Sequence, residues 1–547
     1  MDRSTQLAAR RAEPAGPART PGAPPMSGPH RIARSRPAAY DPSERWGTLP
    51  ARAAQVLEGN WTGTSTVPSR GLYPHQWSWD SAFIAIGLRH LSPLRAQTEL
   101  ETLLEAQWAD GRVPHIVFNP SVPLDAYFPS PDFWRSSTAG RAAGAPRAVQ
   151  TSGIVQPPVH ALAAWLVHRA DPGLSRGRGF LPRVYPRLAA WHRYLLHRRD
   201  LGGGGLVSVV HPWEQGMDNS PAWDAPLSRI AAAPARSFRR ADLDHGAPED
   251  RPTDLDYGRY VRLATDYRDS GYADGAGEFA VEDPAFNALL IASEHALARI
   301  ARELGATGTA RHARAQRLTT ALVDRLWDPA EGTFFCRDLR GGARESGSSR
   351  STALEGERRS QGDARGAEQR SRSSAREAEQ RSRSSARGAG RRSRSGALAP
   401  EQCSLAGALI PERTVSGLIP LLLPTLPHDI ATALVRTLSG PHFGLGGATR
   451  LVPSYDLLGE AFDPHRYWRG PAWFNTGWLL ERGLRTHRQQ AAADALREAL
   501  LETADTSDFA EYVDPRTGEA CGAMGFSWTA ALTLDLLHNA LHKAPRP

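Results

Sequence analysis

Carboxyl groups and indole rings are concentrated in one short stretch of the chain, HPWEQGMDNSPAWD at 211–224. The stretch has no aliphatic run that would form a strand or the core of a helix. Its acids and indoles are Glu214, Asp218, Asp224, Trp213 and Trp223. One interpretation is carbohydrate chemistry, in which a sugar ring lies against an indole while a carboxyl group transfers a proton. An aromatic-rich surface turn with solvated acids explains this stretch alone equally well.

Six other segments also combine aromatic rings with carboxylates, amides, histidines or arginines. They are GLYPHQWSWDSAF, GRVPHIVFNP, SGIVQPPVHAL, RPTDLDYGRY, YWRGPAWFNTGW and FAEYVDPRTGEACGAMGFSW. Each one by itself fits a helix end with a packed ring. Together they favour a sugar-binding site, because aromatic faces and planar polar groups suit the apolar faces and the hydroxyl groups of a pyranose.

Cleavage of a glycosidic bond needs two carboxyl groups, one protonated to release the leaving oxygen and one ionised. If the ionised group activates a water molecule, the two carboxyl groups lie about 6.5–9.5 Å apart and the anomeric configuration inverts. A dry pocket walled by indoles raises the pKa of the acid and keeps it protonated near neutral pH.

These segments lie between predicted helices. Over 282–327, Asp283 can cap a helix and Pro284 suits its first turn, and apolar residues then recur on one helical face until Gly305. A second helix follows after a short loop. Similar helical patterns occur near 80–90, 95–108, 156–169, 183–196, 427–437, 471–485, 487–501 and 526–541. Helix pairs joined by short loops, without the alternating strands of an α/β fold, predict an all-α domain.

The net charge of +8 is concentrated in two segments of low complexity. Residues 1–38 carry seven arginines against two acids, and residues 344–398 carry fourteen arginines against seven acids. The sequence AEQRSRSSAR occurs at 367–376 and again at 378–387. We expect a disordered tail at 1–38 and a disordered, dispensable surface insertion at 343–399. The rest of the chain is mildly acidic, so a nucleic-acid partner is not expected.

Targeting and cofactor signals are absent from the sequence. The N-terminus has no apolar core of a signal peptide, and no apolar stretch is long enough for a membrane span. The cysteines Cys336, Cys403 and Cys521 suggest neither a disulfide framework nor a metal site and suit a reducing cytoplasm. No cluster of His, Asp and Glu has metal-ligand spacing, so we expect no metal and no cofactor.

Four motifs in this order, WSWDSAF, GMDNSPAWD, YWRGPAW and EYVDPRTGE with FSWTAAL, resemble glycoside hydrolase family 63. The similarity is greatest to its bacterial mannosylglycerate and glucosylglycerate hydrolase branch and spans roughly 45–342 and 400–541. The resemblance implies an (α/α)6 toroid formed as one catalytic domain by 39–342 and 400–541. It implies an inverting hydrolase that releases glycerate from a small α-glycoside.

The resemblance also implies roles for individual residues. The general acid falls on Asp218 and the general base on Glu511, which lies in a polar segment; Glu214 and Glu519 are the next candidates. The sugar-site positions fall on Tyr73, Trp77, Trp79, Asp80, His115, Gln156, Trp213, Tyr467, Trp468 and Trp473. Arg251 and Tyr257 correspond to the part that meets a substrate carboxylate, which an Arg fork suits. One departure is Met524, where a polar amide is expected.

Three other interpretations remain. A trehalase-like enzyme or an α-glucosidase that acts on an oligosaccharide would share the toroid, but Arg251 and Tyr257 favour a small anionic leaving group. A non-catalytic glycan-binding protein is disfavoured, because both carboxyl groups of a hydrolase are present. An RNA-associated protein would act through the Arg/Ser repeat. The sequence leaves the choice between glucose and mannose open, since it depends on the pocket around one hydroxyl group.

Overall fold

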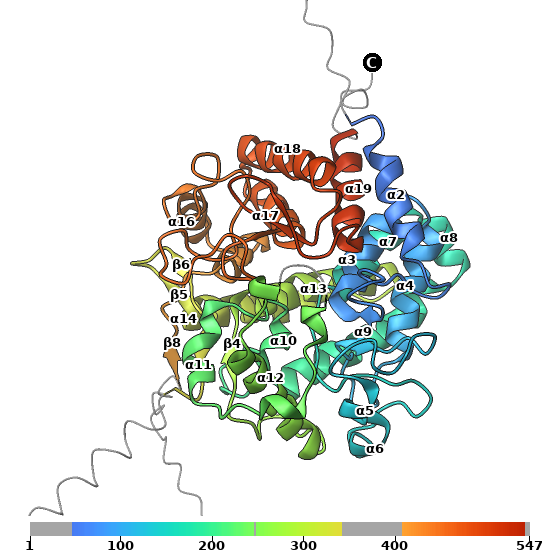
Figure 1. Ribbon diagram of the computed structural model, residues 1–547. Helices are drawn as coiled ribbons and strands as arrows, with labels where there is room; N and C mark the ends of the chain where they lie inside the picture. The colour runs from blue at the N-terminus through green and yellow to red at the C-terminus, as the bar shows by residue number, and fades with distance from the viewer. Residues whose placement is uncertain (1–45, 245–247, 342–406, 542–547) are drawn as a thin grey trace, which may run out of the picture. The chain divides into compact units, whose positions relative to one another are not determined.

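The computed structural model describes residues 46–244, 248–341 and 407–541, which are mostly helical (Figure 1). Contacts group the chain from Trp46 onward into one compact unit. The predictions for the tail at 1–38, the insertion at 343–399 and Cys403 concern residues outside these ranges. Cys336 and Cys521 are buried and unpaired.

Six elements form an inner set in which each packs against the next along the chain. They are α3 (Ser78–Leu88), α7 (His160–Ala170), α13 (Pro284–Glu303), the 3-10 helix η5 (Val415–Leu422), α17 (Phe474–Thr486) and α19 (Ser527–Leu541). The last element, α19, also packs against the first, α3, so the succession closes on itself.

Six further helices pack against the inner set from outside. They are α2 (Leu49–Gly59), α4 (Pro93–Glu105), α9 (Phe180–Arg198), α14 (Thr309–Leu326), α16 (His428–Ser439) and α18 (Gln490–Thr506). In Figure 1, α2, α16 and α18 lie at the periphery of the view, outside α17 and α19. Five of the six outer helices contact the inner element next to them in sequence; α2 contacts α19. Each outer helix can thereby bury one face, as an amphipathic helix requires, whereas the inner helix α3 is buried at every position.

The local signals predicted from the sequence explain where α13 begins and ends. The Asp283 carboxylate accepts a hydrogen bond from the Phe286 backbone N–H, and Pro284 occupies the first turn, where no N–H is needed. After Glu303 the backbone reaches Gly305 at φ +88°, a left-handed conformation that glycine adopts easily. Two of the longer α-helices were not predicted: α2 and α12 (Asp254–Asp269).

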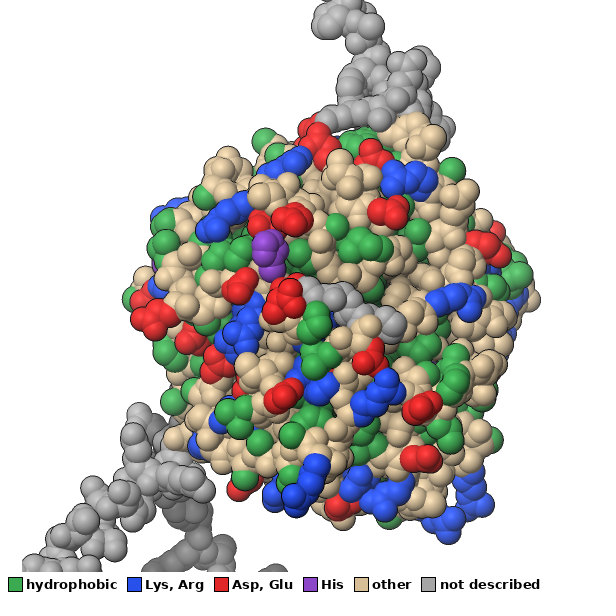
Figure 2. Space-filling model, viewed as in Figure 1, with side chains coloured by type: hydrophobic (Ala, Val, Ile, Leu, Met, Phe, Trp, Pro, Cys, Tyr) green, Lys and Arg blue, Asp and Glu red, His purple; other side chains and the backbone are tan. Residues whose placement is uncertain are grey.

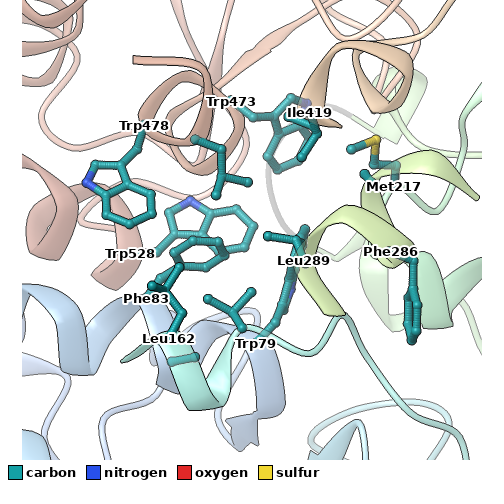
Figure 3. Packing of buried hydrophobic residues seen from close by; sticks show 14 of the residues in the cluster. Trp79, Phe83, Leu162, Met217, Phe286, Leu289, Ile419, Trp473, Trp478 and Trp528 are labelled. Carbon is teal, nitrogen blue, oxygen red and sulfur yellow. The ribbon is translucent and has the colours of Figure 1, made fainter. Parts of the chain in front are cut away.

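Buried side chains from the six inner elements point toward one another (Figure 3). Among the labelled residues, each inner element contributes at least one: Phe83 of α3, Leu162 of α7, Leu289 of α13, Ile419 of η5, Trp478 of α17 and Trp528 of α19. Phe83 contacts both indoles edge to face, with ring centroids 6.0 and 6.4 Å apart. These aromatic and aliphatic contacts join elements that are distant in sequence in one hydrophobic core.

Short strands hold the loops before several inner helices. β1 (Gln76–Trp77) pairs with β2 (Ile116–Val117) directly before α3, and β9 (Ala472–Trp473) precedes α17 in a sheet with β10 (Tyr512–Val513) and β11 (Ala520–Cys521). A third sheet has the order β3 (Ser208–Val209), β4 (Val281–Glu282), β7 (Arg337–Asp338) and β8 (Ala408–Leu409), and β5 (Trp327–Asp328) pairs with β6 (Thr333–Phe334). These two-residue pairings were not predicted, because so short a strand leaves no periodic pattern.

Short helices fill the remaining connections: α5 (Pro131–Trp134), α6 (Ser136–Ala139), α8 (Pro172–Gly177), α10 (Pro212–Gln215) and α11 (Asp224–Ser228). The acid- and indole-rich stretch was expected to be a loop, yet it contains α10 and a 3-10 turn at Pro221–Trp223. On the face drawn in Figure 2, acidic and basic side chains are interspersed and do not gather by sign. None of the helices in the described ranges is long and apolar enough to cross a membrane.

Candidate active site

A cavity of about 770 Å³ lies where the loops before the inner helices converge. Its walls are mostly aromatic, and its polar groups include carboxyl groups and one guanidinium. The lining residues are Pro68, Tyr73, Trp77, Trp79, Asp80, His115, Tyr127, Gln156, Trp213, Gly216, Asp218, Asp242, Arg251, Pro252, Tyr257, Tyr260, Tyr467, Glu511, Phe526 and Trp528. Residues from both ends of the described chain therefore share one chamber.

The cavity contains both carboxyl groups predicted to act and ten of the twelve residues predicted to bind the substrate. The other two, Trp468 and Trp473, do not line it. Their rings stack face to face with centroids 3.8 Å apart, and both are almost fully buried. Trp473 also contacts Tyr467, with centroids 5.1 Å apart, so the stacked pair supports the cavity wall from behind.

Several lining residues were not identified from the sequence. Tyr127 follows the GRVPHIVFNP segment by a few residues, and only the three-dimensional structure brings it to the cavity. Asp242 lies in a segment that carried no recognised motif; both its oxygens are held by Arg240, which also packs over the Tyr257 ring at 4.3 Å. Met524, the departure from the expected pattern, is 45% exposed and lies outside this lining.

The backbone around Asp218 is held by a tight local network. Gly216 has φ +84°, and a Cβ there would lie 2.7 Å from the Trp79 ring, so only glycine lets the loop pass so close to the cavity wall. The Trp223 indole N–H donates to the Met217 carbonyl at 2.8 Å. Because the residues on both sides are fixed, the Asp218 side chain is directed into the cavity.

Glu214 lies outside the cavity and has a structural role. Its carboxylate is completely buried and accepts two hydrogen bonds from the Arg199 guanidinium, at 2.7 and 2.8 Å. It also accepts from the backbone N–H groups of Val155 and Val210, at 3.2 and 2.8 Å. Glu214 thus joins the loop of Trp213 to the segment that carries Gln156. The other reserve candidate, Glu519, has a side chain that is 68% exposed.

The Asp218 carboxyl group is an unusually weak acid in this environment. Burial raises its pKa to about 7, the Arg251 charge opposes the shift, and the Glu511 charge adds to it. Among the described residues no hydrogen bond to this carboxyl group stabilises its ionised form. Asp218 is therefore suited to holding a proton near neutral pH.

Glu511 was expected in a polar segment, and its side chain is 1% exposed. Burial raises its pKa, and four groups oppose this by favouring the ionised form. The Tyr73 and Tyr467 hydroxyls donate to Oε1 at 3.0 and 3.4 Å, and the Ala523 N–H donates to Oε2 at 3.1 Å. Arg251 lies 3.8 Å from Oε2. The protein itself therefore supplies the hydrogen-bond donors that favour the ionised form of Glu511.

A glycine allows the Ala523 backbone to approach Glu511. Gly522 has φ +70°, and a Cβ there would lie 2.6 Å from Oε2 of Glu511 and 2.5 Å from the Tyr512 ring. The same loop is fixed by a bond from the Glu511 N–H to the Ala523 carbonyl at 2.8 Å. The position of this carboxylate therefore depends on a residue without a side chain.

Arg251 is the guanidinium of the cavity and contacts the groups that surround Glu511. It donates to the Tyr73 hydroxyl at 3.1 Å and lies over the Tyr467 ring at 4.6 Å. Tyr257 makes different contacts: its hydroxyl donates to the Phe128 carbonyl, and its ring contacts Trp213 with centroids 6.1 Å apart. Arg251 can thus act on Glu511 as well as on a bound anion.

The remaining polar groups of the cavity are neutral or held in place. Burial lowers the pKa of His115 to about 3, so its ring is uncharged. Burial raises the pKa of Asp80 well above its ordinary value, and the charges of Glu511, Asp218 and Glu99 add to this. Gln156 accepts a hydrogen bond from the Trp79 backbone N–H at 3.1 Å. Among the described residues no group of three or more His, Cys, Asp or Glu could hold a metal ion.

A helical scaffold whose loops bring two carboxyl groups of unlike proton affinity to an aromatic cavity is the arrangement of a glycoside hydrolase. The chain belongs to the family described as the mannosylglycerate hydrolase MGH1-like glycoside hydrolase domain, whose model matches residues 73–529. The resemblance to family 63 found in the sequence motifs is thereby confirmed.

Relatives with known activities are similar over almost their whole length. A mannosylglycerate hydrolase of Rubrobacter radiotolerans is 38% identical, over 89% of this chain and 96% of that protein. A glucosylglycerate hydrolase of Mycolicibacterium hassiacum is 36% identical, over 91% and 99%. The crystal structure of the GH63 mannosylglycerate hydrolase from Thermus thermophilus in complex with Tris and D-glycerate superposes with a TM-score of 0.70. It is 34% identical to this chain, and the match covers 89% of this chain and 99% of that one.

Proposed function

We propose that this glycoside hydrolase cleaves glucosylglycerate or mannosylglycerate to the free sugar and glycerate, with inversion at the anomeric carbon. The observation that carries the proposal is that Asp218, Glu511 and Arg251 line one cavity. The named activities of the relatives support the substrate class.

In the proposed mechanism Asp218 donates its proton to the glycosidic oxygen as the bond to the anomeric carbon breaks. Glu511, ionised by its hydrogen bonds and by Arg251, removes a proton from a water molecule that attacks the opposite face of that carbon. Asp218 ends ionised and Glu511 ends protonated, so one proton transfer between them through solvent restores the enzyme. The differing surroundings of the two carboxyl groups support this assignment.

The predicted substrate residues take roles that follow from their chemistry. We propose that Tyr73, Trp77, Trp79 and Trp213 present ring faces and edges to the sugar, while Asp80, His115 and Gln156 bind its hydroxyl groups. Arg251 and Tyr257 would bind the glycerate end, together with Tyr127. Trp468 and Trp473 would support Tyr467 without touching the substrate, as their stacked position favours.

For the fold, we propose that the closed inner set and its outer helices form an (α/α)6 toroid, with η5 in place of the fourth inner helix. Its single domain would comprise 39–342 and 400–541. The similar proteins match 89% and 91% of this chain, which supports this extent. A cytoplasmic location remains a prediction from the cysteine usage and the N-terminal composition.

The proposed activity is tested with a panel of α-glucosides and α-mannosides, with and without glycerate as the aglycone, assayed by released sugar. We expect turnover of a glycerate glycoside and little or none of trehalose. Proton NMR in the first minutes should show the β-anomer of the sugar before mutarotation mixes the two forms. Initial release of the α-anomer would indicate a retaining enzyme, and turnover of trehalose alone would favour the trehalase-like alternative.

The pH dependence of the reaction follows from the two carboxyl groups. Since Asp218 must be protonated and its pKa is raised to about 7, kcat/KM should fall as the pH rises through about 7. On the acid side, kcat/KM should fall as Glu511 takes up a proton. Because the pKa of Glu511 is raised, this fall should begin at a higher pH than it would for an ordinary glutamate. The measurement is a profile of kcat/KM from acid through neutral to alkaline pH. A rate that stays level well above neutral pH would exclude Asp218 as the acid.

A further inference from the structure

A second cavity lies at the other end of the inner elements. It is open to solvent, with an empty volume of about 1280 Å³, and is lined by Leu162, Ala292, His295, Arg299, Leu422, Pro424, Glu481, Arg482, Arg485, Thr486 and Asn539. α17 begins at Phe474, beside the active site, and Arg482 lies two turns further along it, about 12 Å at a rise of 1.5 Å per residue. Likewise Arg299 and Asn539 lie in the last turns of α13 and α19. The two cavities share no residue.

This cavity carries an excess of positive charge. Among the residues of its lining, Glu481 is the only carboxylate, and it is already paired with Arg485. Arg485 is held in addition by Asp494 at 2.8 Å. The other two arginines of the lining, Arg299 and Arg482, make no ion pair with Glu481. Arg482 packs over the Trp478 ring at 4.7 Å, which fixes it without neutralising it.

The charges around Arg299 are also positive. Its pKa is lowered, first by partial burial of the guanidinium and then by the charges of Arg302, Arg482 and Arg169. The acids that act on Arg482 have closer partners of their own: Asp535 is bound by Arg89 and His90, and Glu481 by Arg485. Like charges that converge on a cavity repel one another when the acids near them are already paired with other groups, and an anion between them would reduce this cost.

We propose that this cavity binds a compact oxyanion of the phosphate type, with Arg299 and Arg482 as its principal ligands. A guanidinium presents two parallel N–H groups to two oxygens, and two of them from different helices suit a tetrahedral dianion. The Asn539 amide, the Thr486 hydroxyl and the His295 ring line the same space and can donate to the remaining oxygens. The anion can be free phosphate or the phosphate group of a small metabolite.

Binding is tested on the full chain by titration calorimetry and thermal unfolding, with inorganic phosphate and with glycerol phosphate as probes. Sodium chloride at equal ionic strength controls for screening. We expect phosphate to raise Tm beyond the effect of chloride and Arg299→Gln to weaken its binding at least tenfold. The Arg299 side chain is exposed over part of its surface, so this change should leave the fold intact. Arg317→Gln, at an exposed position of α14, is the matched control and should bind as the unchanged protein does.

The active site contains a guanidinium of its own, so Arg251→Ala separates the two sites. Phosphate binding should persist in Arg251→Ala and weaken in Arg299→Gln. The proposal is overturned if Arg251→Ala abolishes binding while Arg299→Gln does not, or if phosphate acts no more strongly than chloride. Tighter binding of glycerol phosphate than of phosphate would identify a phosphate ester as the ligand, and the reverse order would identify the free ion.

Discussion

Replacing Asp218 with Asn, or Glu511 with Gln, should lower kcat by at least about 10²–10⁴-fold and leave the protein folded. Asn cannot donate a proton to the leaving oxygen, and Gln cannot accept one from water. Both changes conserve shape, and the hydrogen bonds from Tyr73 and Tyr467 can be accepted by the oxygen of a glutamine. Initial rates with the glycerate glycoside, together with circular dichroism and Tm, measure the two effects separately.

A substrate with a leaving group that needs no proton distinguishes the two roles. A glycosyl fluoride should be hydrolysed well by Asp218→Asn and poorly by Glu511→Gln, because only the base is then required. Asp224→Asn is the matched control in the same stretch, since Asp224 is exposed and pairs with Arg469 outside the cavity lining. The assignment fails if Asp224→Asn is as damaging as Asp218→Asn, or if the fluoride rescues the Glu511 variant instead.

Replacing Arg251 with Ala should produce two separable losses. The first is binding of an acidic leaving group: a hydrogen-bonded charge contributes about 1.5–3 kcal/mol, so KM for a glycerate glycoside should rise about 10- to 150-fold. The second is support of Glu511, 3.8 Å away, whose ionised form Arg251 favours. That loss should lower kcat for acidic and neutral glycosides alike and shift the acid limb of the pH profile to higher pH.

A neutral α-glycoside of the same sugar is the comparison substrate for this experiment. Its KM should change little in Arg251→Ala, while its kcat should fall as for the glycerate glycoside. Arg251→Lys keeps the charge near Glu511 and loses the forked geometry, so it should preserve the pH profile better than it preserves KM for the acid. Equal changes in KM for both substrates would show that Arg251 does not bind the aglycone.

Much of the helical architecture was predictable because its signals are local. The cap at Asp283, the proline at the first turn of α13 and the left-handed Gly305 are properties of a few neighbouring residues. α12 was missed because its apolar residues are few and it begins within a motif that was interpreted for its chemistry. η5 was missed because Pro420 and Gly417 interrupt any helical pattern, and a Cβ at Gly417 would lie 2.2 Å from the Phe334 carbonyl.

The sequence by itself determined which residues are available for chemistry, since ordered motifs place Asp218, Glu511 and Arg251 in loops between helices. Only the tertiary structure decided how deeply these groups are buried and which neighbours shift their pKa values. Glu511 was expected in a polar segment, yet it is buried and depends on Tyr73, 438 positions away. Trp468 and Trp473 were expected at the sugar, and their rings stack on each other outside the cavity lining. A pKa and a contact depend on desolvation and on neighbours through space, and the chain encodes these only through the complete fold.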